Sequence, residues 1–414
     1  MNIEASCAPH PEDPSLFLLF LELAAAEEAA QPRKPVHLVL AIDASSSMGG
    51  PRLACAVEAG RAVADRLGPE DMFCLLAFDR SVRTLFGPGL ADDAARKVVH
   101  EALAKLRPGV GTALYDALQK SHEALRRVFV RGTRPHVVIL TDGYPSVGPN
   151  RPEAFSELSR RAAEEGLVTS AVGVGLDFDE EAVGAIAAGG GGRYSFVDKE
   201  SDIPGALARH LSDLFSIAIE NVTVRLAPGN TVREATLLHR YPTKVSPDGF
   251  VVETGPIGRG NPRRLLFLLK ATATPAPVAA TIALTVRGSG TDAEHESNRI
   301  LSVPVNPASL AAKEAVRELY RLTLASQENG FWEAVHQNDR MRAQKASEQA
   351  MSALMALEQA GAPATEIESD KGRLADQRAV LDGRLSAEAR EMARKRSHHT
   401  SISRITSVFD PEGS

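Results

Sequence analysis

The feature of this sequence that most constrains its fold is the apolar run Val36–Ile42, which ends abruptly at Asp43. Such a run indicates a strand buried on both faces of a parallel sheet. Two serines, Ser45 and Ser47, follow the aspartate at alternate positions. A carboxylate and two hydroxyl groups that leave the end of a buried strand together form a compact cluster of hard oxygen ligands, the kind that Mg²⁺ prefers.

Two further oxygen-bearing residues complete this candidate set downstream. Thr112 lies in the turn Gly109–Thr112, and Asp142 directly follows another apolar run, His136–Thr141. Mg²⁺ takes about six oxygen ligands and keeps several waters where few carboxylates are offered. Because only two of the five side chains carry charge, we predict a Mg²⁺ or Mn²⁺ site with an open position. An Asp or Glu carboxylate of a protein partner would fill that position.

The same five residues have a simpler explanation, since Ser and Thr cap helices and Asp turns the chain. Their placement at two strand ends and in one intervening loop favours the metal site. The pattern Asp43-x-Ser45-x-Ser47, followed by Thr112 and then Asp142, resembles the metal-ion-dependent adhesion site of von Willebrand factor type A (VWA) domains, including integrin I domains. All five motif positions are filled in this sequence.

The region around these residues shows alternating strand and helix patterns, with six strand patterns between residues 36 and 219. Such alternation predicts an α/β fold, a doubly wound and mostly parallel sheet with right-handed crossovers and helices on both faces. Ligands of such folds bind beyond the carboxyl ends of the strands. The resemblance implies a six-stranded, Rossmann-like VWA domain over 36–219 and places Asp43 and Asp142 on two neighbouring central strands.

The flanking segments predict a second domain. Residues 220–306 form short strand patterns separated by Pro and Gly turns, a spacing that predicts a β-sandwich. A strand pattern over 15–26 has no partner nearby. We therefore expect the N-terminal segment, residues 1–30, to supply a further strand to the sandwich, with the VWA domain inserted between the two segments. This layout is similar to that of bacterial VWA proteins.

The C-terminal region predicts a small α-helical bundle over 307–396. We expect one helix that ends at Asn329-Gly330, a second over Phe331–Gln359, and a third over Glu366–Arg396. Residues 397–414 contain too few apolar side chains to fold, and this composition predicts a disordered tail.

The tail carries clustered hydroxyl groups that follow the basic run Arg394–Arg396 in the sequence. Arg404 lies three residues before Ser407, as in the substrates of basophilic kinases, so Thr406 and Ser407 are candidate phosphorylation sites. Alternatively, the acidic end Asp410–Glu412 would occupy the open metal position of a neighbouring molecule, or the tail is inert.

Composition excludes several classes of protein. A formal net charge of -6 argues against a general nucleic-acid binder. Three cysteines in unrelated contexts give no disulfide framework, which indicates a reducing compartment. The apolar run Leu16–Leu21 has no Lys or Arg before it, whereas a signal peptide requires them, and no stretch is long enough to span a bilayer. We expect a cytoplasmic protein without a membrane span.

We therefore expect a non-enzymatic adaptor or scaffold that recognises an acidic residue of a protein partner through its metal ion. The resemblance implies work beside a chaperone-like ATPase or a Ser/Thr kinase system. One alternative is a metal-dependent hydrolase with Asp43 or Asp142 as base. Another is a structural scaffold in which the metal only holds the loops of the site in place. The hydrolase lacks an acid–base partner, because His136 begins the strand whose far end bears Asp142 and the site segments contain no histidine.

Overall fold

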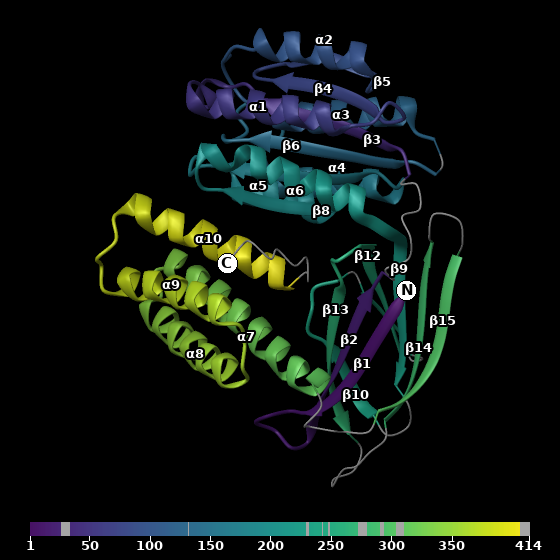
Figure 1. The fold of residues 1–414 in the computed structure, drawn as a ribbon. Helices are drawn as coiled ribbons and strands as arrows, with labels where there is room; N and C mark the ends of the chain where they lie inside the picture. The colour runs from purple at the N-terminus through teal and green to yellow at the C-terminus, as the bar shows by residue number, and fades with distance from the viewer. Residues whose placement is uncertain are drawn as a thin grey trace. The chain divides into compact units, whose positions relative to one another are not determined.

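The computed structural model divides the chain into two compact units (Figure 1). One unit comprises Pro32–Phe215, and the other combines Met1–Gln31 with Ser216–Ser414, so that the first unit is inserted into the second. The structure describes residues 1–25, 34–130, 132–228, 232–241, 243–246, 249–271, 280–289, 294–303 and 310–405.

Among the described residues, the inserted unit is built on a sheet of six strands in the order β5-β4-β3-β6-β7-β8 (Figure 1). Neighbouring strands are parallel except β5, which runs antiparallel to β4 at the sheet edge. Every residue of the central strand β3 is buried, as the apolar run predicts. This arrangement confirms the predicted doubly wound, Rossmann-like fold. The strands are β3 Val36–Asp43, β4 Met72–Phe78, β5 Val82–Leu90, β6 Arg134–Thr141, β7 Val168–Val174 and β8 Gly191–Val197.

Helices cover this sheet on both faces. On one face, a Cβ placed on Gly60 of α1 would lie 3.2 Å from Ile42 Cδ1 of β3. On the other face, Leu125 of α3 lines the same small gap as Val39 of β3, and successive residues of a strand point to opposite faces. The helices of this unit are α1 Pro51–Arg66, α2 Asp93–Ala104, α3 Leu114–Val128, α4 Pro152–Glu164, α5 Glu180–Gly189 and α6 Ile203–Ser216.

The second unit contains two antiparallel sheets that share one core. Leu19 and Leu21 of β2 and Phe267 of β13 cluster with Val222 and Val224 of β9. The N-terminal segment supplies two paired strands, β1 and β2, where the sequence indicates one, and β2 pairs with the distant β13. The sheet orders are β1-β2-β13-β10 and β11-β12-β9-β14-β15. The strands are β1 Asn2–Pro9, β2 Leu16–Ala24, β9 Ile217–Pro228, β10 Val232–Leu237, β11 Thr243–Ser246, β12 Gly249–Gly258, β13 Arg263–Ala271, β14 Ala280–Ser289 and β15 Glu294–Val303.

The described C-terminal region consists of four helices rather than the predicted three. The predicted stop at Asn329-Gly330 is wrong, because both residues lie inside α7. A glycine inside a helix costs only about 1 kcal/mol. The two residues that follow Gly330, Phe331 and Trp332, are buried in an apolar cluster, and their rings pack edge to face 5.0 Å apart. The chain turns instead at Asn338, which has a positive φ of 56°. The helices are α7 Leu310–His336, α8 Arg340–Gln359, α9 Ala364–Leu381 and α10 Ala387–Ile405.

The predicted single helix over Glu366–Arg396 is also wrong, because it is interrupted between α9 and α10. Gly383 takes a positive φ of 69°, a conformation that glycine adopts readily and that ends a helix. The helix α10 begins after this break. Of the helices in the part of the chain that the structure describes, none combines the length and the apolar character needed to cross a membrane.

The prediction of a disordered tail is wrong as far as Ile405, the last residue of α10. Ile405 joins an apolar cluster with residues of β2 and α7, and Arg404 Nη2 lies 2.9 Å from Asp370 Oδ1 of α9. Long-range contacts therefore order a segment that is locally too polar to fold. Because Asp370 binds its guanidinium group, Arg404 is less suited to guide a kinase to the tail. The candidate phosphorylation sites lie outside the described residues: Thr406 and Ser407.

Candidate metal centre

Two neighbouring parallel strands bring Asp43 and Asp142 to the same edge of the sheet. β3 pairs with β6 so that Ile42 lies opposite Leu140. Asp43 is the last residue of its strand, and Asp142 follows the last residue of the other. Both aspartates are 0% exposed. Burying a carboxylate is costly unless opposite charges and hydrogen bonds compensate it, so the groups around these two aspartates decide what the site can bind.

Hydrogen bonds from Ser45 and Thr141 hold the carboxylate of Asp43. The backbone N–H of Ser45 donates to Oδ1 at 2.8 Å, and the hydroxyl of Thr141 donates to Oδ2 at 2.6 Å. Burial raises the pKa of Asp43 to about 6, although these hydrogen bonds oppose the increase. A carboxylate offers about four lone pairs. Asp43 is thus fixed in orientation and still has lone pairs for a cation.

The two serines connect the two aspartates. Ser45 Oγ lies 3.0 Å from Ser47 Oγ, and Ser47 Oγ donates to Asp142 Oδ1 at 2.7 Å. A short 3₁₀ turn, Ser46–Met48, shapes this loop before Pro51 opens α1. Proline suits the first turn of a helix because its missing N–H has no helical partner there. Through the Ser47 hydroxyl, this loop is hydrogen-bonded to Asp142 at the end of β6.

Thr112 reaches the same point from a separate loop. Its backbone N–H donates to Ser146 Oγ at 2.9 Å, and the N–H of Ser146 donates to the Thr112 carbonyl at 3.1 Å. A Cβ placed on Gly143 would lie 3.4 Å from Thr112 Oγ1 and 3.6 Å from Ser47 Oγ. The absence of a side chain at Gly143 thus leaves space beside these hydroxyls. The structure brings together all the predicted site residues: Asp43, Ser45, Ser47, Thr112 and Asp142.

Arg52 is a residue of this site that the sequence interpretation missed. Its Nη1 donates to Asp142 Oδ2 at 2.9 Å, and it also lies 3.9 Å from Asp177 Oδ2. The Asp177 side chain is 74% exposed, whereas that of Arg52 is 27% exposed. The available signal was an arginine in the first turn of the helix that follows the Asp43–Ser47 motif, close to carboxylates that need a counter-charge.

The side chains present fit a divalent cation that prefers oxygen. Two buried carboxylates and three hydroxyls are all hard ligands, which suit Mg²⁺ or Mn²⁺ better than Zn²⁺. Within the described ranges, no group of three or more His, Cys, Asp or Glu could hold a metal ion. The candidate site therefore depends on its hydroxyl groups as well as its two aspartates.

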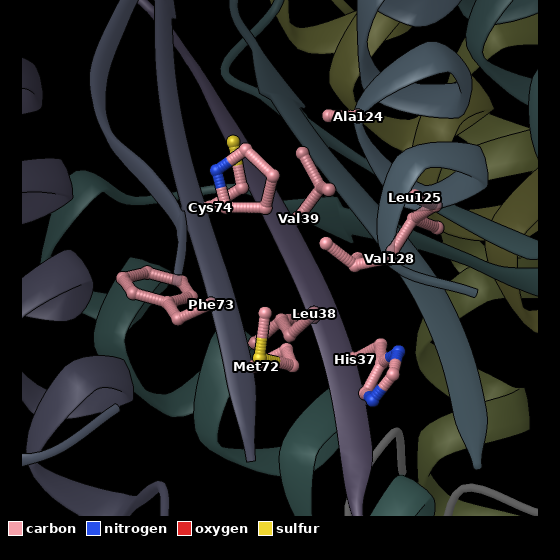
Figure 2. A pocket seen from close by; sticks show the side chains of 10 residues that line it. His37, Leu38, Val39, Met72, Phe73, Cys74, Ala124, Leu125 and Val128 are labelled. Atoms are coloured by element: carbon pink, nitrogen blue, oxygen red, sulfur yellow. The ribbon is translucent and has the colours of Figure 1, made fainter. Parts of the chain in front are cut away.

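A small gap in the core lies elsewhere, near the start of β3 (Figure 2). Its lining is mostly apolar and includes His37, Val39 and Cys74, and the gap is too small to hold a water molecule. Burial raises the pKa of the Cys74 thiol to about 12, so the thiol stays protonated. His37 and Asp43 are the second and last residues of β3, about 20 Å apart at roughly 3.3 Å per residue. The gap is thus a packing feature, distinct from the candidate metal centre.

Two exposed apolar side chains flank the candidate metal centre. Val110, two residues before Thr112, is 74% exposed, and Tyr144, two residues after Asp142, is 61% exposed. Exposed aromatic and large apolar side chains beside a polar site are common in protein interfaces. They give this edge of the sheet an apolar border.

A mostly parallel sheet that presents two aspartates and three hydroxyls at its carboxyl edge defines a class of protein domain. The inserted unit is a VWA domain, and residues 37–209 match the family model of the von Willebrand factor type A domain.

Known proteins share parts of this sequence and its fold. The uncharacterized protein sll0103 of Synechocystis sp. is 25% identical over 213 residues, an alignment that covers 51% of this chain and about half, 49%, of that protein. The von Willebrand factor type A structure from Catenulispora acidiphila matches with a TM-score of 0.68 at 15% identity and covers 92% of this chain and 89% of its own. The ArnB paralog VWA2 from Sulfolobus acidocaldarius matches with a TM-score of 0.60 at 13% identity, covering 98% and 97%. At these identities, the structural likeness concerns the fold alone.

Proposed function

We propose that the VWA domain is a metal-dependent protein-binding module. Mg²⁺ or Mn²⁺ would be held by oxygens of Asp43, Ser45, Ser47, Thr112 and Asp142, and would offer an electrophilic position to a carboxylate. The observation that carries this proposal is the meeting of two fully buried carboxylates with three hydroxyl groups at one edge of the sheet. A partner that supplies an Asp or Glu side chain would complete the coordination of the metal.

Two features favour binding over hydrolysis. The loops that form the site, residues 43–52, 109–113 and 142–147, contain no histidine. Both oxygens of Asp142 accept hydrogen bonds from side chains of the site, and as a metal ligand this carboxylate would not be available as a base. A general base must lie within hydrogen-bond reach of the proton that it removes. A screen of phosphatase, esterase and peptidase substrates with Mg²⁺ and Mn²⁺ tests the hydrolase alternative. Metal-dependent hydrolysis of any one of these substrates would establish it.

The exposed side chains near the site support a more specific proposal about the partner. Val110 and Tyr144 offer apolar contact area, and aromatic side chains contribute strongly to protein interfaces. We therefore infer that the acidic residue of the partner lies within an apolar patch. In this proposal the chain is an adaptor or scaffold of the cytoplasm, where its three free cysteines would stay reduced. The resemblance to bacterial VWA proteins motivates an ATPase or Ser/Thr kinase system as the source of that partner.

Calorimetric titration with Mg²⁺ tests the metal site. We expect the wild-type protein to bind Mg²⁺ at roughly millimolar metal or below, and Asp43→Ala and Asp142→Ala to lose binding while retaining their circular dichroism spectra. Ser46→Ala is the matched control, because Ser46 lies in the same loop but is exposed. Wild-type protein that shows neither binding heat nor a thermal shift with Mg²⁺ or Mn²⁺ would refute the proposal.

A capture experiment tests the partner. Immobilised wild-type protein should retain a partner from its native cell in Mg²⁺ and release it in a chelator. Asp43→Ala should retain none, and Ser46→Ala should behave as wild type. Capture that is equal for wild type and Asp43→Ala would show that partner binding does not use the metal site.

A further inference from the structure

Arg52 gives the candidate metal centre a fixed positive charge of its own. Its guanidinium group donates to Asp142 Oδ2 at 2.9 Å, and Asp142 is 0% exposed. Room for this group comes from Gly175, which has a φ of 71° and where a Cβ would lie 3.0 Å from Arg52 Nη2. The backbone at Gly175 and the buried Asp142 therefore fix the position of the Arg52 side chain.

The charged side chains around the site set the net charge that a metal ion meets, and then the net charge that a carboxylate ligand meets. Asp43 and Asp142 together carry two negative charges, which Mg²⁺ alone would neutralise. With Arg52 in place, the same site is less negative before the metal binds and has an excess positive charge after it binds. The nearby Asp177 is 74% exposed, so water screens its charge more effectively than the charges of the buried aspartates.

We propose that Arg52 shifts the site from binding the metal alone toward binding the metal together with the acidic ligand. Its positive charge repels Mg²⁺ and so weakens binding of the metal alone, and the same charge attracts the carboxylate that completes the loaded site. The metal and the carboxylate attract each other directly, so each binds better in the presence of the other, and Arg52 favours the site that holds both over the site that holds the metal alone. This inference rests on the proposed function and adds a mechanism by which the domain would favour anionic ligands.

A second role of Arg52 must be separated from this one, because the guanidinium also fixes the orientation of Asp142. Arg52→Gln removes the charge and keeps a hydrogen-bond donor. Arg52→Lys keeps the charge and removes the planar fork of donors. If Arg52 only oriented Asp142, both variants would bind Mg²⁺ more weakly than wild type. If its charge matters, only Arg52→Gln changes the balance between metal and carboxylate binding.

The experiment measures the Kd for Mg²⁺ of the full chain by calorimetry in sodium chloride and in sodium acetate at equal ionic strength. Acetate is the carboxylate probe, and free Mg²⁺ is corrected for acetate complexation in every arm. The coupling ratio, the Kd in chloride divided by the Kd in acetate, measures how much more strongly acetate binds to the metal-loaded site than to the metal-free site. Thermal unfolding of each variant checks that it is folded.

We expect the wild-type ratio to exceed one, meaning that acetate tightens Mg²⁺ binding. Arg52→Gln should bind Mg²⁺ in chloride more tightly than wild type, roughly fivefold or more, and its coupling ratio should fall toward one. Arg52→Lys should keep a ratio close to that of wild type. The coupling proposal is overturned if Arg52→Gln keeps the wild-type ratio, or if both variants lose Mg²⁺ affinity equally. Absence of Mg²⁺ binding by wild type would overturn the proposed function as well, so the two failures are distinguishable.

Discussion

At the scale of single residues, His122 of α3 shows how the VWA core constrains a titratable group. It is 0% exposed, and its Nε2 lies 2.9 Å from the hydroxyl of Thr169, which is also 0% exposed. Its Nδ1 has no hydrogen-bond partner within the described structure. Burial, followed by the positive charge of Arg126, lowers the pKa of His122 to about 4, and Glu165 opposes this shift. The folded state therefore holds this imidazole neutral.

This neutral histidine predicts that acid destabilises the VWA domain. The folded pKa lies below the unfolded value near 6.5, so the unfolded state binds the proton more readily. Stability is then complete above about pH 6.5 and falls as the pH decreases toward 4. At about 1.4 kcal/mol per pKa unit, His122 contributes at most about 3 kcal/mol to this loss. Urea unfolding between pH 7 and pH 4 should show a smaller loss for His122→Gln than for wild type. Equal losses would mean that other groups control the acid response.

At the scale of the element, α7 continues through a glycine that the sequence suggests as its end. Gly330 lies six residues before the last residue of this helix, His336, and a Cβ on it would meet nothing within 4 Å. Gly361 has the opposite character. It follows α8 with a positive φ of 77°, where a Cβ would lie 3.1 Å from Arg317 Nη2. The two glycines thus form a matched pair, one inside a helix and one beyond a helix end.

Gly330→Ala should stabilise the second unit by up to about 1 kcal/mol, because alanine restricts the unfolded chain and favours the helix. Gly361→Ala should destabilise the unit by about 1–2 kcal/mol, because a Cβ is unfavourable in the left-handed conformation. Denaturant unfolding of both variants checks the pair. A loss of stability in Gly330→Ala would contradict the helical environment that the structure gives to Gly330.

The strands of the site could be predicted from the sequence, whereas contacts between residues far apart in the chain could not. The site strands were predictable, because Val36–Ile42 and His136–Thr141 are apolar runs that stop at aspartates, and the resemblance to VWA domains implies that both aspartates lie on neighbouring strands. The order of α10 was not predictable from local composition, since it depends on Asp370, 34 residues from Arg404. The contact of Arg52 with Asp142 was missed for a similar reason, because 90 residues separate the pair.

At the scale of the whole molecule, the second unit is built from two segments that are far apart in the sequence. The second unit needs its N-terminal segment, because β1 and β2 form one sheet with β13 and β10, two strands that come from beyond residue 215. Leu21 of β2 is 0% exposed within the core of that unit, and Leu75 of β4 is 0% exposed within the VWA sheet. Each unit therefore has a core of its own, the property that allows a domain to fold independently.

Separate cores predict that the two units unfold in separable steps, which one leucine in each core can identify. Truncation of a buried leucine to alanine costs about 2–5 kcal/mol. Leu75→Ala should lower the thermal transition of the VWA domain, and Leu21→Ala should lower the transition of the second unit. Because the proposed metal ligands all lie in the VWA domain, Mg²⁺ should raise only the transition that Leu75→Ala lowers. Differential scanning calorimetry of the full chain, with and without Mg²⁺, measures both. If Leu21→Ala lowered the Mg²⁺-sensitive transition as much as Leu75→Ala does, the inserted domain would depend on the unit that surrounds it, and the independence of the two cores would be disproved.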